Sequence, residues 1–261
     1  MTISTTATEI ITATTATAAT AIAAILASGA VNRYPGSVQA FLFDMDGVIV
    51  DSNPVHTVAW QIYLDRFGIV VPGLEDRMFG RRNDEIIRDF FPMALTDEEV
   101  FRHGANKEAL YRELMGPQIA SRLVPGVLDF LAARREVPAA LATNAEPKNV
   151  AFVLDAAGLS DRFLAVVDGH QVERPKPHPE IYLKAARLVG AEPKDCVVFE
   201  DSYAGAEAAR AAGARVVGVT TSHETFPDVD FTIAGFDDPR LAQWLGNGGS
   251  HDAVPTKRGQ R

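Results

Sequence analysis

The sequence of 261 residues is poor in several features that would assign it to a common class. It contains one cysteine, Cys196, which excludes an internal disulfide. That residue lies in an apolar run, so we expect a buried, unreactive thiol. The net charge is −9, and no basic run precedes the last few residues. This balance argues against nucleic acid as a main partner.

Long hydrophobic stretches are also scarce. In the Ala- and Thr-rich segment 1–36, the longest apolar run is Ala21 to Ala27, far short of the ~20 residues that span a bilayer. No Lys or Arg precedes Arg33, whereas a secretory signal normally opens with positive charge. We interpret 1–36 as a disordered extension, with a processed leader as the alternative, and 246–261 as a disordered tail. We expect a cytoplasmic monomer without a membrane partner.

Beyond residue 37, short apolar runs alternate with helical patterns. This alternation is typical of a parallel sheet with helices on both faces. The fold class predicted is therefore α/β, with a three-layer, Rossmann-like parallel-sheet core. The candidate strands are Ala40–Phe43, Ala139–Ala142, Leu164–Val167, Val197–Phe199, Arg215–Val219 and, more weakly, Asp230–Ile233.

The chain between the first two candidate strands shows helical patterns and no convincing strand. Thr96 to Glu99 has the residues of a capping box, which predicts the start of a helix. We predict an all-helical cap at 53–121, inserted into a core made of 37–52 and 122–245. Open α/β sheets bind ligands at the carboxyl ends of their strands, so the cap is expected to lie over that edge.

The first candidate strand ends in two carboxylates, Asp44 and Asp46. Side chains alternate along a strand, so residues two apart point to the same side. Like charges held that close resist joint ionisation. Such a pair supplies a nucleophile beside an acid/base, as phosphoryl transfer through an acyl-phosphate requires. Gly47 then lets the backbone turn close to a bound anion.

Further polar residues follow three other strands and are expected at the same sheet edge. Thr143 and Asn144 can donate to phosphate oxygens, or can serve only as turn residues. Prolines on both sides of Lys176 stiffen the backbone and could aim the ammonium at the acids, although a solvated lysine is the commoner meaning of an isolated Pro-Lys-Pro. Glu200 and Asp201 carry hard oxygen ligands suited to Mg²⁺, or are acids at a helix start.

In this order, the motifs resemble those of the haloacid dehalogenase-like superfamily. Within it, they are similar to the branch with a helical cap that includes β-phosphoglucomutase and many sugar-phosphate phosphatases. The resemblance covers roughly Phe41 to Thr220. It implies that Asp44 is the nucleophile and Asp46 the general acid/base.

The same resemblance implies the remaining roles. Thr143 and Asn144 would bind the transferring phosphoryl group, and Lys176 would neutralise it. Mg²⁺ would be held by Asp44, the main-chain carbonyl of Asp46 and Asp201, with Glu200 behind them as support. The substrate would be a small phosphorylated metabolite.

The phosphoryl acceptor is less well determined by the sequence. The mutase pattern has an arginine where this chain has Asn83, and Glu146 is an unusual residue for holding a second anion. We therefore expect a Mg²⁺-dependent phosphatase acting on a phosphorylated sugar or polyol through an aspartyl-phosphate. The alternatives are β-phosphoglucomutase-like transfer and a catalytically weak phosphometabolite-binding protein.

Three residues are candidates for substrate selection from the cap: His56, Arg81 and Arg82. Each also has a structural interpretation. A histidine at a helix start commonly ties a hinge, and an exposed basic pair is common at a helix start.

Overall fold

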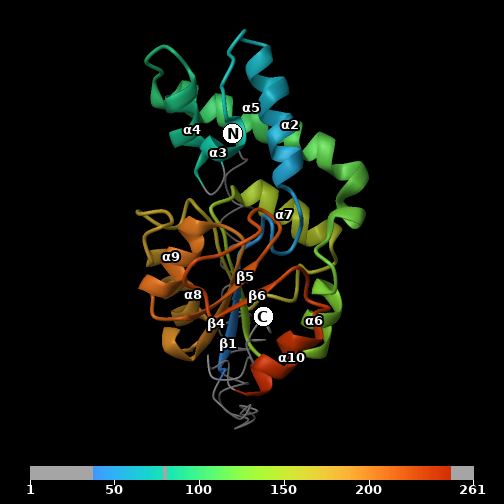
Figure 1. Cartoon of the computed structure of the whole chain (residues 1–261). Coiled ribbons are helices and arrows are strands. Elements are labelled where there is room, and N and C mark those ends of the chain that lie inside the picture. The colour runs from blue at the N-terminus through green and yellow to red at the C-terminus, as the bar shows by residue number, and fades with distance from the viewer. Residues whose placement is uncertain (1–37, 79–80, 248–261) are drawn as a thin grey trace, which may run out of the picture.

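The computed structural model describes residues 38–78 and 81–247 (Figure 1). Its six strands form one parallel sheet in the order β3-β2-β1-β4-β5-β6. The strands are β1 (Ala40–Phe43), β2 (Ala139–Ala142), β3 (Ala165–Val167), β4 (Cys196–Glu200), β5 (Arg215–Val219) and β6 (Phe231–Ile233). All the predicted strands are present, with bounds that shift by one residue at β3, β4 and β6.

Strand β1 lies inside the sheet and is buried on both faces. Phe41 and Phe43 point to one face, where the ring of Phe43 stacks on Phe199 with centroids 4.8 Å apart. Ala40 and Leu42 point to the other face and belong to a separate apolar cluster. A strand with two buried faces needs helices on both sides.

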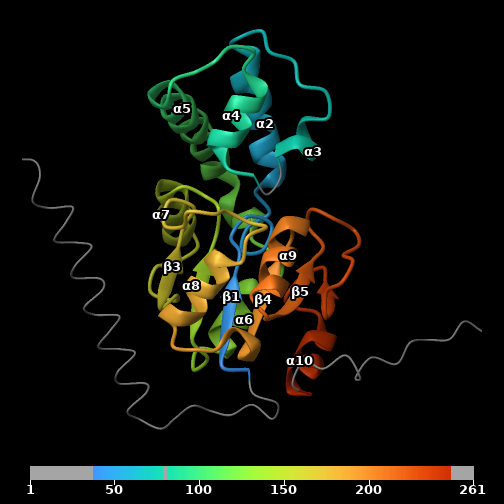
Figure 2. The ribbon, with the colours of Figure 1, turned by 90° about the vertical axis from the view of Figure 1, so that its left-hand side faces the viewer.

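Helices supply these two outer layers (Figure 2). Helices α8 (Glu180–Leu188) and α9 (Tyr203–Ala211) cover the face of Ala40 and Leu42. The opposite face packs against α6 (Val127–Ala133), α7 (Pro147–Ala156) and α10 (Pro239–Gly246). A short 3-10 turn, η2 (Pro193–Asp195), precedes β4. The three-layer α/β class predicted from the sequence is confirmed.

The cap contains helices and no strand among its described residues. They are α2 (Asn53–Asp65), α3 (Leu74–Met78), α4 (Asn83–Phe90), α5 (Asp97–Met115) and the 3-10 helix η1 (Gly116–Arg122). Its core is a third apolar cluster that includes Trp60, Ile87 and Phe90. The predicted capping box is present, because Glu99 N donates to Thr96 Oγ1 at 3.3 Å and Thr96 N donates to Glu99 Oε2 at 2.9 Å.

Two neighbouring chain segments connect the cap to the sheet. Asp51 N donates to Arg122 O at 2.7 Å, and the Arg122 guanidinium donates to the Asp51 carboxylate at 3.1 Å. Val50 and Leu123 form an antiparallel bridge beside them. The joined segments place α2 and α5 above the carboxyl ends of the strands (Figure 1).

Several expectations concern other parts of the chain. Cys196 is fully buried, and burial raises the pKa of its thiol to about 12, as expected for an unreactive cysteine. Within 38–78 and 81–247, no helix has the length and apolar character to cross a bilayer. The predicted extension at 1–36 lies outside the described residues. So does the predicted tail from 248 onward, while Gly246 is the last residue of α10.

Two helical glycines should respond to the same substitution with opposite signs. Gly→Ala in a helix normally stabilises by up to about 1 kcal/mol. At Gly104 in α5, an added Cβ would meet Ile87 Cδ1 at 3.5 Å, so we expect Gly104→Ala to stabilise. At Gly205 in α9, it would lie 1.8 Å from Glu200 Oε1, so we expect Gly205→Ala to destabilise by about 1–3 kcal/mol. Urea unfolding of both variants measures this, and equal stabilisation would contradict the close packing at Gly205.

Candidate active site

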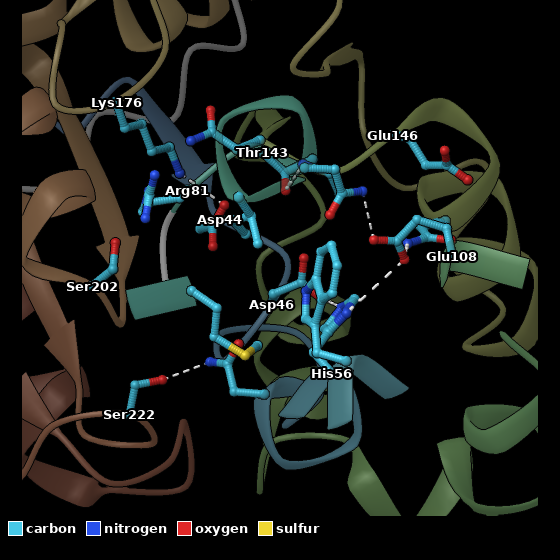
Figure 3. A pocket seen from close by; sticks show the side chains of 18 of the residues that line it. Asp44, Asp46, His56, Arg81, Glu108, Thr143, Glu146, Lys176, Ser202 and Ser222 are labelled. Carbon is cyan, nitrogen blue, oxygen red and sulfur yellow. Dashed lines mark hydrogen bonds and ion pairs between the residues drawn. The ribbon is translucent and has the colours of Figure 1, made fainter. Parts of the chain in front are cut away.

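The polar residues predicted at strand ends meet at one edge of the sheet. Asp44 follows β1, Thr143 follows β2, and Glu200 ends β4. These strands are direct neighbours, and Asp44 N continues the ladder by donating to Phe199 O at 3.0 Å. A pocket opens above this edge and is lined by residues of both core and cap (Figure 3).

Lys176 connects two of these carboxylates. Its Nζ lies 2.8 Å from Asp44 Oδ1 and 2.5 Å from Glu200 Oε1. It comes from the loop between β3 and α8, and only 7% of its surface is exposed. Burial alone would lower the pKa of Lys176, but the two carboxylates raise it above its usual range. The residue therefore presents a permanent positive charge to Asp44.

Glu200 supports this arrangement from behind. Besides Lys176, its carboxylate accepts hydrogen bonds from Tyr182 Oη at 2.6 Å and Ser202 Oγ at 3.0 Å. The main-chain nitrogens of Asp201 and Ser202 add two more, each at 3.1 Å. A carboxylate that accepts this many hydrogen bonds is fixed in place. Its oxygens are engaged by the protein itself, so Glu200 holds Lys176.

The acidic residues at this edge fit a divalent cation. Asp44, Glu200 and Asp201 offer oxygens within 4.8 Å of one another, all of them buried. One lysine faces three carboxylates. Burial and the neighbouring acids raise the pKa of Asp44 to about 7, although Lys176 acts in the opposite direction. Burial, Glu200 and Asp44 also raise the pKa of Asp201 well above its usual range. Excess negative charge on hard oxygens is what Mg²⁺ binding would relieve.

Asp201 has positioning contacts that the sequence did not indicate. Its Oδ2 accepts from Asn53 Nδ2 at 2.9 Å and from the hydroxyl of Ser222. Asn53 begins cap helix α2, and Ser222 lies in the loop after β5. A Cβ added to Gly47 would fall 1.9 Å from Asp201 Oδ2, and Gly47 has a φ of +76°. The loop after Asp46 therefore approaches Asp201 closely, as only glycine allows.

Asp46 faces the pocket and has its own partners. Its Oδ1 accepts from Ser52 Oγ at 2.6 Å and lies 3.5 Å from His56 Nε2. His56 Nδ1 lies 2.7 Å from Lys107 Nζ. An ammonium only donates, so Nδ1 accepts and the ring proton is placed on Nε2, toward Asp46. The His56 ring stacks on Tyr111 with centroids 3.8 Å apart, which holds this orientation.

A second charged group fills the cap side of the pocket. Glu108 accepts from Lys107 Nζ at 2.8 Å, Asn83 Nδ2 at 2.7 Å and Asn149 Nδ2 at 2.5 Å. Burial alone would raise the pKa of Glu108, but Lys107 and the other donors lower it to about 2. The Glu108 carboxylate is therefore ionised at neutral pH, and it is paired with Lys107. Sequence patterns did not reveal them, since adjacent Lys and Glu on a helix are usually solvated.

The remaining predicted residues lie at different depths. Thr143 and Asn144 line the pocket, and Thr143 Oγ1 also accepts from Ala145 N at 3.1 Å, as a turn residue would. Arg81 lines the pocket too, while its guanidinium donates to Asp89 at 3.0 Å. Arg82 is not among the lining residues of this pocket and pairs with Asp84 at 3.2 Å.

Comparisons with known proteins identify the same family as the sequence motifs. A family model of haloacid dehalogenase-like hydrolases matches residues 38–213. The fructose-1-phosphate phosphatase of Escherichia coli is 34% identical, over 72% of this chain and 97% of its own length. The phosphorylated carbohydrates phosphatase of Thermotoga maritima is 33% identical, over 71% of this chain and 87% of its length.

The chain belongs to the haloacid dehalogenase-like hydrolases. The crystal structure of β-phosphoglucomutase from Clostridium difficile superimposes with a TM-score of 0.71 at 26% identity, covering 80% of this chain and 97% of that one. The resemblance inferred from the motifs is thus confirmed, as is the expectation that the chain is an enzyme of the hydrolase class.

Removal of the Glu108 carboxylate should strongly destabilise the fold. Glu108→Ala would leave the Lys107 ammonium, 1% exposed, without its charge partner. Breaking a buried ion pair on one side costs about 3–5 kcal/mol. The matched control is Glu113→Ala on the exposed face of the same helix, where we expect a change within about 0.5 kcal/mol. Urea unfolding compares them, and equal stability of the two variants would contradict the assigned role.

Proposed function

We propose that this hydrolase is a Mg²⁺-dependent phosphatase that hydrolyses a small phosphorylated sugar or polyol through an aspartyl-phosphate on Asp44. The observation that carries the proposal is the pairing of two differently held carboxylates. Asp44 is bound to Lys176 at 2.8 Å, and Asp46 faces Ser52 and His56 in the same pocket. The first is placed as a nucleophile and the second as a proton carrier. Relatives named as phosphatases of phosphorylated sugars support it.

The residues divide the chemistry between them. A carboxylate oxygen of Asp44 attacks phosphorus, and the bond from phosphorus to the sugar oxygen breaks. Asp46 gives its proton to that departing oxygen. Asp46 then takes a proton from water, and the hydroxide formed displaces Asp44 from phosphorus. Atoms and charge balance over the two steps, which release an alcohol and inorganic phosphate.

Positive charge supports both steps. Lys176 neutralises Asp44 in the resting state and the phosphoryl oxygens during transfer, while Thr143 and Asn144 offer donors beside them. When bound, Mg²⁺ on Asp44, Asp201 and the Asp46 carbonyl supplies further stabilisation of the phosphoryl charge. Electrostatic stabilisation and positioning account for most of the catalysis in phosphoryl transfer.

Water is favoured over a sugar hydroxyl as acceptor by the residues on the cap side. Asn83 donates to Glu108 at 2.7 Å, and Glu146 pairs with Arg112 at 2.6 Å. Neither side chain offers a positive charge to a second phosphate. The structural similarity to β-phosphoglucomutase keeps intramolecular transfer as the second candidate. Transfer would convert β-glucose 1-phosphate to glucose 6-phosphate, whereas hydrolysis releases phosphate, and a coupled assay separates them.

Replacement of the nucleophile should abolish turnover. We expect Asp44→Asn to lower kcat by on the order of 10³-fold or more, because no covalent intermediate can form. Folding should change little, since a neutral amide suits a buried site in which the pKa of Asp44 is already raised. Phosphate release from a panel of sugar and polyol monophosphates measures the first effect, and thermal unfolding the second. Substantial residual activity in a clean preparation would refute the assignment.

Divalent cations should control the activity. We expect no phosphate release in excess chelator, full recovery with Mg²⁺, and inhibition by Ca²⁺, which is larger and tolerates less regular coordination. The buried excess of carboxylate at Asp44 and Asp201 is the physical basis. Full activity in the chelator would count against the metal site, and the unfolding temperature in chelator shows whether loss of activity reflects loss of structure.

A further inference from the structure

The cap side of the pocket contains two cations and two carboxylates whose charges cancel. We call Lys107, Glu108, Arg112 and Glu146 the distal cluster. Lys107, Glu108 and Glu146 line the pocket, where Figure 3 shows Glu108 and Glu146, and Arg112 pairs with Glu146. The cluster joins cap helix α5 to the start of core helix α7.

The inner half of the distal cluster is buried. Lys107 is 1% exposed and Glu108 3% exposed, and their charged atoms are 2.8 Å apart. The low pKa of Glu108 keeps its carboxylate ionised. The Lys107 charge is therefore neutralised before any substrate arrives.

The outer half of the distal cluster, Arg112 with Glu146, is also an ion pair. Arg112 Nη1 donates to Glu146 Oε1 at 2.6 Å and to Asn149 Oδ1, also at 2.6 Å. Glu146 is the N-cap residue of α7, so its carboxylate stands at a helix end that would otherwise attract an anion. A carboxylate of the chain therefore stands at this helix end.

The other basic side chains that line the pocket within the described residues also face carboxylates. Arg81 pairs with Asp89 at 3.0 Å, and His56 Nε2 faces Asp46 at 3.5 Å. Lys176 lies between Asp44 and Glu200 at the phosphoryl site. Outside the phosphoryl site and its proposed metal, every basic side chain of the described lining therefore has a carboxylate beside it. None of them is left unpaired to bind a phosphate dianion.

A neutral, hydroxyl-bearing group fits the same surface. An ionised carboxylate has about four lone-pair sites. Asn83, Lys107 and Asn149 donate to Glu108, which leaves room for one more donor. A sugar or polyol hydroxyl can donate there, whereas a phosphate dianion has no proton to offer and would be repelled.

Given the proposed function, on which this step rests, we infer that the distal cluster makes the enzyme selective for substrates with one phosphate and an uncharged, hydroxylated leaving group. Glu108 and Glu146 are the specificity-determining residues, because they neutralise Lys107 and Arg112 and place their own carboxylates where a second phosphate would lie. Like charges placed side by side in a binding site are a strong means of rejecting a ligand.

The test compares each monophosphate with the bisphosphate of the same sugar, using fructose 1-phosphate with fructose 1,6-bisphosphate and glucose 6-phosphate with glucose 1,6-bisphosphate. For the wild type we expect kcat/KM to favour the monophosphate by at least about tenfold. Glu146→Gln keeps the size of the side chain and removes its charge, so it separates repulsion from steric exclusion. We expect this variant to narrow the ratio by about fivefold, because Arg112 then lacks its carboxylate.

Glu207→Gln is the control, since it makes the same change in net charge on the exposed face of α9 and should leave the ratio unaltered. Calorimetry of the same ligands on the Asp44→Asn variant measures binding without turnover. If the wild type releases no phosphate but the Asp44→Asn variant binds the monophosphate more tightly than the bisphosphate, the proposed function fails and this inference stands. Bisphosphates accepted within twofold of monophosphates, an unchanged ratio in Glu146→Gln, or no binding of either ligand would overturn the inference.

Discussion

The buried ion pair between Asp44 and Lys176 is the contact on which the other features of the site depend. Carboxylates at the end of an inner strand lose most of their hydration, and an unpaired buried charge costs several kcal/mol. Three of them, Asp44, Glu200 and Asp201, are buried together with one lysine. Lys176 compensates part of this charge and Glu200 is satisfied by hydrogen bonds. Burial and the remaining excess of negative charge raise the pKa of Asp44 to about 7. This excess explains why the site suits a cation.

Parallel pairing of the strands makes this concentration of charge possible. Because β1 lies between β2 and β4, the residues that follow these three strands lie side by side at the same edge of the sheet. Close approach of the backbone to two of the carboxylates then sets the distances within the site. Gly47 and Gly205 leave room for the carboxylates of Asp201 and Glu200, where any side chain would collide. The two glycines are therefore as necessary to the site as its charged residues. A side chain that displaced Glu200 would break its contact with Lys176.

The sequence predicted the parts of the structure that depend on local pattern. Apolar runs indicated the strands, and the residues after them could be placed together because parallel strands end at one edge. The capping box at Thr96 was equally local. Contacts made between distant helices left no such pattern. Lys107 and Glu108 are adjacent on α5 and resemble a solvated surface pair, and Tyr182 resembles any apolar helix residue. Their burial depends on how the cap meets the core, which periodicity does not describe.

The charges of the distal cluster also bear on how the cap is held. Glu108 is bound by Asn83 and Lys107 from the cap and by Asn149 from the core, and Arg112 reaches from the cap to Glu146. Moving α5 away from α7 would remove the core partners of both side chains at once. The observed position of the cap on the core is therefore stabilised by the protein's own charges. An enzyme whose cap is held in place by a second phosphate would need the opposite arrangement, with unpaired cations on each side of the pocket.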